Sequence, residues 1–521
     1  MKALAQLRVS MAGLHIWGGL CFGWLLYAVF LTGTLSYYRD EISLWMRPEL
    51  QTRLVEPSEA AQRAIRRLET IGQGAYRWLI EMPDARMPVA SLAVWREAGP
   101  GPRFQREAFD PASRAPSPAR ATHGGDFLYY FHFDLHMPWR LGRFLVGIAA
   151  MAMLVAIASG VIVHRRIFAD FFTFRPGRAQ RSWLDAHNAA GVLALPYHVM
   201  ITYTGLVPLM FLYLPQGIDL AFPGQRASFF AATGQSLPTP PAAGRPAPLV
   251  DLAPLVAEAM RRWGGKEVGR IDVRRPLDAH ARIELTASDA SHLSHGRGRL
   301  VFDGTDGRLL SSDADASWVV ATERAMYGLH LARFADPALR ALLFLSGVAG
   351  TAMVGTGLLL WAAARRRKAG EAPQRTGHRL VDILNVATIA GLPVAIGAFF
   401  WANRLLPAAL PGRAGWEVDA FFAAWAAAAL HAALRPRAAA WVEQLAAAAV
   451  LLACLPLLNA LATGRGLHRS LTAGDWVFAG FDLCALAAGL LLALLALRAG
   501  RPAAVRTRSR PGPARPRGSG A

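Results

Sequence analysis

Two histidines, His187 and His198, stand eleven residues apart in the apolar stretch between Trp183 and Leu206. Eleven residues are close to three helical turns, so both imidazoles are predicted to lie on one helix face, about 16 Å apart along the axis. A histidine at hydrocarbon depth is costly unless it faces the bundle interior and finds a partner. The spacing therefore predicts two polar sites at two depths of a membrane bundle.

The composition places these histidines in a polytopic α-helical membrane protein. The chain has 521 residues, of which 53% are hydrophobic, and a formal net charge of +20. The apolar residues form long runs, and a helix of about 20 residues crosses a bilayer. Eight spans are predicted, near residues 13–36, 141–164, 187–213, 339–362, 381–402, 416–434, 441–463 and 475–497. The three cysteines fall within these spans, so no disulfide framework is expected.

The basic residues follow membrane topology and do not indicate nucleic-acid binding. They cluster before the first span, between the second and third, after the fourth and the sixth, and in the tail. The positive-inside rule then predicts an inner-membrane protein with both termini in the cytoplasm. The predicted divisions are a first span (1–37), an outer segment (38–140), spans two and three (141–213), a second outer segment (214–338), span four (339–364), a basic loop (365–380), spans five to eight (381–497) and a disordered basic tail (498–521).

Each outer segment is predicted to form a small periplasmic α+β domain. The first has a helix-like stretch at 57–71, followed by strand candidates at Tyr76–Met82, Ala90–Arg96 and Phe104–Phe109. The second has a helix-like stretch at 251–264, followed by strand candidates at Glu267–Val273 and Ala281–Thr286. Such short runs between turn residues are typical of an antiparallel sheet with one helix packed on it.

The unit of span, outer segment and span is duplicated in parallel. The corresponding residues are His15 and His187, Gly19 and Gly191, Gly33 and Gly205, and, through the matching motifs FDLHMPWR and YGLHLARF, His136 and His330. Neither His164 nor His198 has a copy, and Leu26 stands opposite His198. A parallel repeat predicts two copies about a pseudo-two-fold axis along the membrane normal.

Several segments resemble the PepSY-associated transmembrane-helix family over about residues 10–365, among them LHIWGGL, TGTLSYYRDE, LDAHNAAGVLALPYHVMITYTG and GVAGTAMVGTGLLLW. The family includes bacterial iron-regulated membrane proteins and inner-membrane siderophore reductases that carry b-type haem. The resemblance implies PepSY-like outer domains, a four-helix haem-binding core, four further spans and a role in iron acquisition.

Neutral imidazole is a common axial ligand of haem iron, and a four-helix bundle can hold the macrocycle. The candidate ligands divide by depth, with His15, His164 and His187 at the inner ends of their spans and His136, His198 and His330 towards the outside. We expect two haem b groups, an inner one between the first three spans and an outer one near His198 with His136 or His330. The ligand pairs stay open, and interfacial roles remain alternatives for the single histidines at helix ends. His132 is expected to face water.

These features predict transmembrane electron transfer that reduces a ferric siderophore or similar chelate at the periplasmic face. The sequence has no GxGxxG after a strand and no GxxxxGK[ST], so electrons would come from membrane quinol or a separate reductase. Arg39, Arg140 and Arg333 could attract an anionic chelate, although anchoring at the membrane interface is the commoner role. Two alternatives stay open: a PepSY-based binding or regulatory module, and a permease-like component of iron uptake without redox activity.

Overall fold

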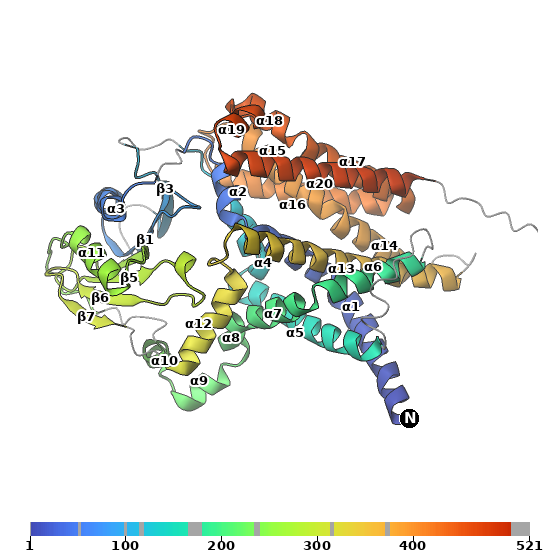
Figure 1. The fold of residues 1–521 in the computed structure, drawn as a ribbon, viewed down its shortest axis with the longest axis horizontal. Helices are drawn as coiled ribbons and strands as arrows, with labels where there is room; N and C mark the ends of the chain where they lie inside the picture. The colour runs from blue at the N-terminus through green and yellow to red at the C-terminus, as the bar shows by residue number, and fades with distance from the viewer. Residues whose placement is uncertain are drawn as a thin grey trace, which may run out of the picture.

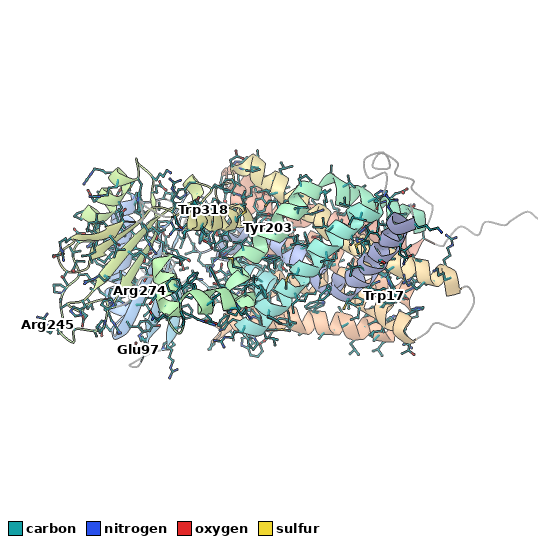
Figure 2. All side chains as sticks on the ribbon, turned by 90° about the horizontal axis from the view of Figure 1, so that it is seen from below. Trp17, Glu97, Tyr203, Arg245, Arg274 and Trp318 are labelled. Carbon is teal, nitrogen blue, oxygen red and sulfur yellow. The ribbon has the colours of Figure 1, made fainter. Side chains whose placement is uncertain are left out.

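A β-sheet lies at one end of the molecule and a bundle of long helices extends from it (Figure 1). The computed structural model describes residues 2–50, 54–97, 102–113, 119–164, 180–233, 240–312, 317–369 and 376–501. In the side-chain view, Glu97 and Arg245 lie at the sheet end and Trp17 lies near the opposite end (Figure 2). We call these ends the sheet side and the far side. The basic loop at 165–179, part of the loop at 365–380 and the tail beyond 501 lie outside the described residues.

Eight helical segments of the described chain are long and apolar enough to cross a membrane, which confirms the predicted number. They are Ala5–Ser36, Trp139–Val163, Leu195–Tyr213, Pro337–Lys368, Thr376–Leu405, Arg413–Leu434, Arg437–Thr463 and Trp476–Gly500. They belong to α1 (Lys2–Ser36), α5 (Trp139–Val163), α7 (Leu195–Leu206) with the short turns after it, α13 (Pro337–Ala369), α14 (Thr376–Ile389) with α15 (Gly391–Leu405), α16 (Arg413–Leu434), α17 (Arg437–Ala453) with α18 (Leu455–Thr463), and α20 (Trp476–Gly500).

The third predicted span is interrupted. α6 (Gln180–Leu193) carries His187 and ends just before α7, which carries His198. Pro196 stands in the first turn of α7, where its missing N–H costs no helical hydrogen bond. Residue Ala194 between the two helices leaves the helical conformation, with φ of −108° and ψ of 21°. The span therefore consists of two helices, one for each histidine.

Short helices connect the spans to the sheet. They are α2 (Arg39–Trp45), α4 (Gly125–Asp134), η1 (Val207–Leu209), α8 (Met210–Tyr213), α9 (Gln216–Ala221), α10 (Arg226–Ala232), η2 (Asp289–Ser291), α12 (Trp318–Leu331) and, among the last spans, α19 (Leu467–Thr472). α4 and α12 occupy corresponding places, each leading into a span. Each ends at a residue in the left-handed region, Leu135 with φ of 57° and Ala332 with φ of 52°.

The strands of both outer segments form one antiparallel sheet in the order β3-β2-β1-β4-β5-β6-β7. The strands are β1 (Ala75–Glu81), β2 (Ala90–Arg96), β3 (Phe104–Phe109), β4 (Val268–Arg274), β5 (Arg282–Ala287), β6 (Arg299–Asp303) and β7 (Leu309–Ser312). β1 pairs with β4, and the register places Trp78 opposite Val273 and Ile80 opposite Ile271. The two copies of the repeat therefore meet at the centre of the sheet.

The expectation of two separate outer domains is corrected by this pairing. The two predicted helices are present as α3 (Pro57–Ile71) and α11 (Leu252–Arg262), and both pack on the same apolar face of the sheet. Trp78, Val273 and Ile80 belong to one continuous core with residues of both helices. Separate domains would leave β1 and β4 as exposed edges, whereas their pairing satisfies the backbone groups of both strands. The sequence shows the strands of each copy but not this junction.

The last four spans pack against the first copy through a buried polar cluster. The indole of Trp45, at the end of α2, stacks on Phe481 with ring centroids 4.0 Å apart and donates a hydrogen bond to Asp482 at 2.9 Å. The guanidinium of Arg404 lies 3.6 Å from the Trp45 ring centroid and donates to Asn459 at 2.9 Å. Buried charges are tolerated where they are paired and hydrogen-bonded. This cluster fixes α15, α18 and α20 against α2, the short helix that follows α1.

Candidate functional site

Two histidines from different copies of the repeat meet on the sheet side: His132 of α4 and His330 of α12. Their ring centroids are 6.0 Å apart and their planes differ by 24°. Nδ1 of His132 donates to the carbonyl of Val29 at 2.7 Å, and Nδ1 of His330 donates to the carbonyl of Ile201 at 3.0 Å. A carbonyl can only accept, so each ring carries its proton on Nδ1 and keeps a free lone pair on Nε2.

A second pair of the same construction lies on the far side: His15 of α1 and His187 of α6. The ring centroids are 6.1 Å apart and the planes differ by 74°. Nδ1 of His15 donates to the carbonyl of Ala156 in α5 at 2.9 Å, and Nδ1 of His187 donates to the carbonyl of Met353 in α13 at 2.8 Å. The Nε2 lone pairs are again free. The predicted correspondence of His15 and His187 is therefore also a spatial pairing.

A glycine packs against the Cε1 atom of each of the four rings. A Cβ added to Gly33 or Gly205 would lie 2.6 or 2.7 Å from Cε1 of its sheet-side histidine. A Cβ added to Gly160 or Gly357 would lie 3.1 Å from Cε1 of its far-side histidine. The sheet-side glycines therefore cannot gain a side chain unless the imidazole moves, and the far-side glycines have slightly more room.

The two copies build the pairs with the same spacing along the chain. His15 precedes Val29 by fourteen residues, and His187 precedes Ile201 by fourteen residues. In each copy the first span thus carries one far-side imidazole and the carbonyl that orients one sheet-side imidazole. Fourteen helical residues rise about 21 Å, which is the approximate separation of the two levels along α1.

Each pair has the separation of two imidazoles that share one metal ion. Two metal–nitrogen bonds of about 2 Å each, with the distance from nitrogen to ring centre added twice, put the centroids roughly 6 Å apart. A ligating histidine usually donates its other N–H to a carbonyl or carboxylate, as these four do. Within the described residues, no group of three or more His, Cys, Asp or Glu side chains could hold a metal ion. A pair suffices where the remaining ligands come from a macrocycle, as they do in haem.

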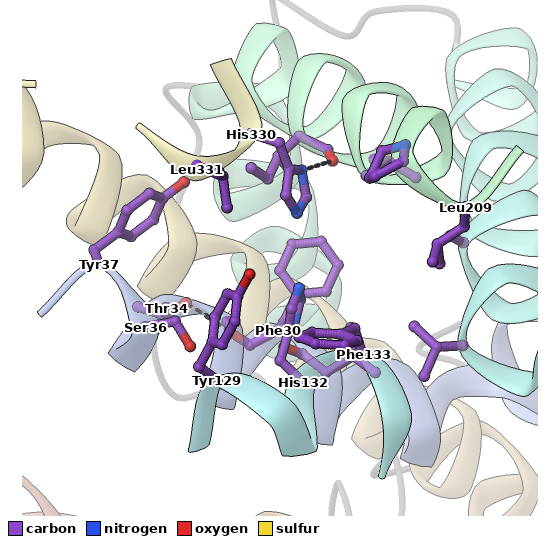
Figure 3. A pocket seen from close by; sticks show the side chains of 18 of the residues that line it. Phe30, Thr34, Ser36, Tyr37, Tyr129, His132, Phe133, Leu209, His330 and Leu331 are labelled. Atoms are coloured by element: carbon purple, nitrogen blue, oxygen red, sulfur yellow. Dashed lines mark hydrogen bonds between the residues drawn. The ribbon is translucent and has the colours of Figure 1, made fainter. Parts of the chain in front are cut away.

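A cavity of about 250 Å³ adjoins the sheet-side pair. His132 and His330 project towards it from opposite walls, and Phe30 and Tyr129 lie beside them (Figure 3). Its charged lining consists of one carboxylate and four arginines, namely Asp40, Arg39, Arg86, Arg143 and Arg333. The excess of positive charge suits an anionic group.

The four arginines of the cavity differ in how their charge is balanced. Arg39 pairs with Asp126, and Arg86 pairs with Glu41 at 2.9 Å. Arg143 and Arg333 make no ion pair within the part of the chain that the structure describes, and Nε of Arg143 is buried there without a hydrogen-bond partner. These two side chains are held without a direct ion pair, although Asp40 and Asp289 lie near Arg333 and Asp134 lies near Arg143.

Burial favours the neutral form of the sheet-side histidines. It lowers the pKa of His330 to about 3, with a smaller contribution from nearby His132. Burial also lowers the pKa of His132, against the opposing effect of its hydrogen bond to Val29. Neutral imidazole is the form that ligates a metal.

The structure does not bring His136 to the sheet-side pair. His136 follows the end of α4 with φ of 55°, and its ring packs against Phe127 and Phe422 at centroid distances of 5.8 and 5.5 Å. Phe422 belongs to α16, so this ring faces the last four spans and not the cavity. His132, one helical turn earlier, takes the place opposite His330.

The expectation that His132 faces water is therefore wrong. The shared letters LH in FDLHMPWR and YGLHLARF conceal a difference in helix length: α12 continues through its LH to Leu331, whereas α4 ends at Asp134, before His136. Pro138 is a signal that a helix ends shortly before it, and counting back from it would have favoured His132.

The remaining predicted ligands join neither pair. His164 follows the last residue of α5, and its Nε2 is buried without a hydrogen-bond partner among the described residues. His198 is fully buried, and a Cβ at Gly350 of α13 would lie 3.1 Å from its Nε2. His187 also contacts α13, so both rings are directed towards that helix, but they lie on two separate helices, α6 and α7, and not on one face of a continuous span.

The three arginines singled out from the sequence lie in different surroundings. Arg39 and Arg333 line the cavity, and Arg39 also lies over the ring of Tyr129 at 4.4 Å from its centroid. Arg140 is exposed and lies over Trp139 at 5.1 Å, which agrees with a role at the membrane interface.

Comparison with known proteins matches residues 12–364 to the family described as the PepSY-associated TM region. The match begins in α1 and ends in α13, so it contains both histidine pairs and the complete sheet. The chain is also 29% identical over 328 residues to the uncharacterised protein PA4219 of Pseudomonas aeruginosa, which covers 60% of this chain and 80% of that protein. Spans five to eight lie outside the family match.

Proposed function

The chain belongs to the family of the PepSY-associated TM region, and from that premise we propose that it is a haem-dependent transmembrane reductase of a ferric siderophore or similar ferric chelate. The chelate would be reduced at the periplasmic face of the bacterial inner membrane, with both chain termini in the cytoplasm. Ferrous iron, bound more weakly by such chelates, would then be released for uptake.

The observation that carries the proposal is the duplicated histidine pair. Four imidazoles from the four core spans and the helices joined to them each donate Nδ1–H to a backbone carbonyl and leave Nε2 free. Both ring separations suit a shared metal, and the sheet-side pair adjoins a cavity. These residues fit two haem b groups, one held by His15 and His187 and the other by His132 and His330.

Haem b, when bound, supplies a centre that gains and loses one electron. The contribution of the chain is to place two ligand pairs at two depths and to fix each ring by a carbonyl. Membrane quinol or a separate reductase would donate electrons on the far side. On the sheet side, Arg143 and Arg333 give the cavity wall a positive charge that favours an anionic ligand.

The test is an absorbance spectrum of the full chain, purified after expression with ample haem. We expect a reduced-minus-oxidised spectrum of b type and two haems per chain. His187→Ala and His330→Ala should each remove one haem, because each removes a ligand of a different pair. His136→Ala is the matched control and should keep both, since its ring faces α16.

A colourless preparation would contradict the proposal and favour one of two functions that need no haem. One is a PepSY-based binding or regulatory module, for which the seven-stranded sheet would be the binding layer. The other is a permease-like component of iron uptake. Loss of haem in His136→Ala but not in His330→Ala would contradict the ligand assignment alone.

A further inference from the structure

His198 is the buried polar side chain that the two pairs leave unused. It has no exposed surface, and neither ring nitrogen has a hydrogen-bond partner of good geometry within the described residues, where the backbone groups of Gly191 and Ser346 lie near the ring. A buried polar group without a partner costs about 1–3 kcal/mol, and the few that proteins keep are often associated with bound water or a redox role. The position of the His198 imidazole distinguishes between bound water and a redox role.

His198 lies between the two pairs. It stands one helical turn before Ile201, whose carbonyl orients the sheet-side ring of its copy. On α13 it meets Gly350, one turn from Met353, whose carbonyl orients the far-side ring of the same copy. His198 follows His187 by eleven residues and precedes Ile201 by three, so at 1.5 Å per helical residue it lies between the two levels and nearer the sheet-side one.

Thr202 connects this imidazole to the sheet-side cavity. It follows His198 by one turn of α7, so the two side chains lie on the same face. Thr202 is 7% exposed, its hydroxyl has no hydrogen-bond partner in the described structure, and it lines the cavity. Two unpartnered polar groups thus lead from the cavity towards the centre of the bundle.

The other copy of the repeat has no such group. Leu26 follows His15 by eleven residues, as His198 follows His187, and Leu26 is buried with 5% exposure. Because the first copy orients its two histidines equally well around a leucine, the imidazole is not needed to build a pair. The role of the His198 imidazole therefore belongs to the second copy alone.

We propose that His198 is a proton acceptor coupled to electron transfer, an inference that rests on the proposed function. Haem b, when bound by a neighbouring histidine pair, would supply a centre that a quinol-class donor can reduce by one electron, and this reduction would remove one positive charge from the surroundings of His198. Removal of a like charge favours protonation, so the imidazole gains one proton from the outside solution through the cavity and Thr202. When the electron passes to the ferric chelate, which becomes ferrous, the proton returns to the outside solution.

The surroundings of His198 contain other titratable groups but no close carboxylate in the described structure. Its own helix contributes Tyr197, with ring centroids 5.8 Å apart. Tyr37, in the turn directly after α1, places its hydroxyl 3.1 Å from that of Tyr197. α6 contributes His187, which is assigned to the far-side pair. Phe30 of α1 and Gly350 of α13 also contact the ring, and the backbone groups of Gly191 and Ser346 lie near it. Phenols do not change charge near neutral pH, which leaves His198 as the free titrating group.

The test is a spectroelectrochemical titration of the haem-loaded full chain at several pH values around neutrality. The half-reduction potential of the wild type should fall as pH rises, because reduction takes up a proton. His198→Leu, which copies the residue of the other repeat, should lose most of this pH dependence while both haems remain bound. His198→Gln can still hold a water but cannot take a proton, so it should lose the dependence as well.

Thr202→Val separates the route from the acceptor. It should keep the equilibrium pH dependence, because His198 is intact, and slow the proton uptake that follows rapid reduction. Full pH dependence in both His198 variants, with both haems present, would overturn this inference and leave the proposed function standing. A wild-type chain without haem would overturn the proposed function and, with it, this inference.

Discussion

The two copies of the repeat share the parts that orient the four histidines and differ in nearly everything around them. In both, a span carries one imidazole and, fourteen residues later, a carbonyl for another, and a glycine lies under each ring. The first span is one continuous helix, α1, whereas its counterpart is broken between α6 and α7. In the described residues, the second copy has the extra short helices α9 and α10 between this span and the sheet. What duplication preserved is the geometry of the rings, not the shape of the helices.

The copies also differ in their neighbours. The first copy packs against the last four spans, where Trp24 donates to Asn385 at 2.8 Å and Trp45 reaches Asp482. In the second copy, only 17% of the α7 span is buried within the chain. The second copy also reaches the last spans, from α13, where Arg366 pairs with Asp382 at 2.7 Å. The contrast is therefore between two single spans: the α1 span with Leu26 is 28% buried, and the α7 span with His198 is 17% buried. The two copies therefore orient their histidines in the same way, but they differ in their contacts with the rest of the chain.

The largest expected effect comes from filling the space under the rings. Gly33→Ala and Gly205→Ala place a Cβ within 2.7 Å of a sheet-side imidazole, which must then move. Loss of ligand orientation typically lowers metal affinity by about 10–100-fold, so each variant should lose the sheet-side haem. Haem content and the spectrum of the purified chain measure this.

The far-side glycines provide the comparison. Gly160→Ala and Gly357→Ala bring the Cβ only to 3.1 Å, so the far-side haem should be retained with weaker binding. Gly18→Ala is the control, because nothing lies within 4 Å of its added Cβ. If all four Gly→Ala variants lost haem equally, the space beside the rings would be equally limited at both levels. That outcome would contradict the difference between the Cβ distances.

Sequence patterns predicted the repeated elements well because each depends on local periodicity. The helix at 57–71 and the first three strands lie within one residue of their predicted bounds. The β1–β4 junction could not be predicted, because backbone pairing between distant strands leaves no local signal. His132 was missed for a related reason. The match of the two LH motifs paired His136 with His330 by sequence, whereas the residue that faces His330 depends on where α4 ends.

The junction of the copies gives a prediction of intermediate size. Ile271 of β4 and Ile80 of β1 are opposite each other and completely buried. Ile271→Ala removes buried contacts from both copies at once and should destabilise the chain by about 2–5 kcal/mol. Thermal unfolding of the full chain in detergent measures the change. Leu310→Ala on the edge strand β7, where the side chain is 37% exposed, is the control, with an expected change within about 0.5 kcal/mol.

The smallest expected effect is a pH dependence confined to the first copy. Asp126 anchors α4, the helix of His132, by accepting from Arg39 and Arg106. Burial alone would raise the pKa of its carboxyl, but the charge and hydrogen bond of Arg39 outweigh burial and hold the pKa below its usual value. A depressed pKa adds stability above the unfolded-state value of about 3.9, and this stability is lost as pH falls through the folded-state pKa.

The second copy has an arginine, Arg324, and not a carboxylate at the corresponding place, six residues before its sheet-side histidine. Asp126→Asn should cost about 1–3 kcal/mol at neutral pH, because it removes a charge-assisted hydrogen bond. Unfolding midpoints of the wild type and this variant, measured from neutral to acid pH, should converge as Asp126 is protonated. Parallel curves would mean that α4 is held by packing alone and that the two copies do not differ in this respect.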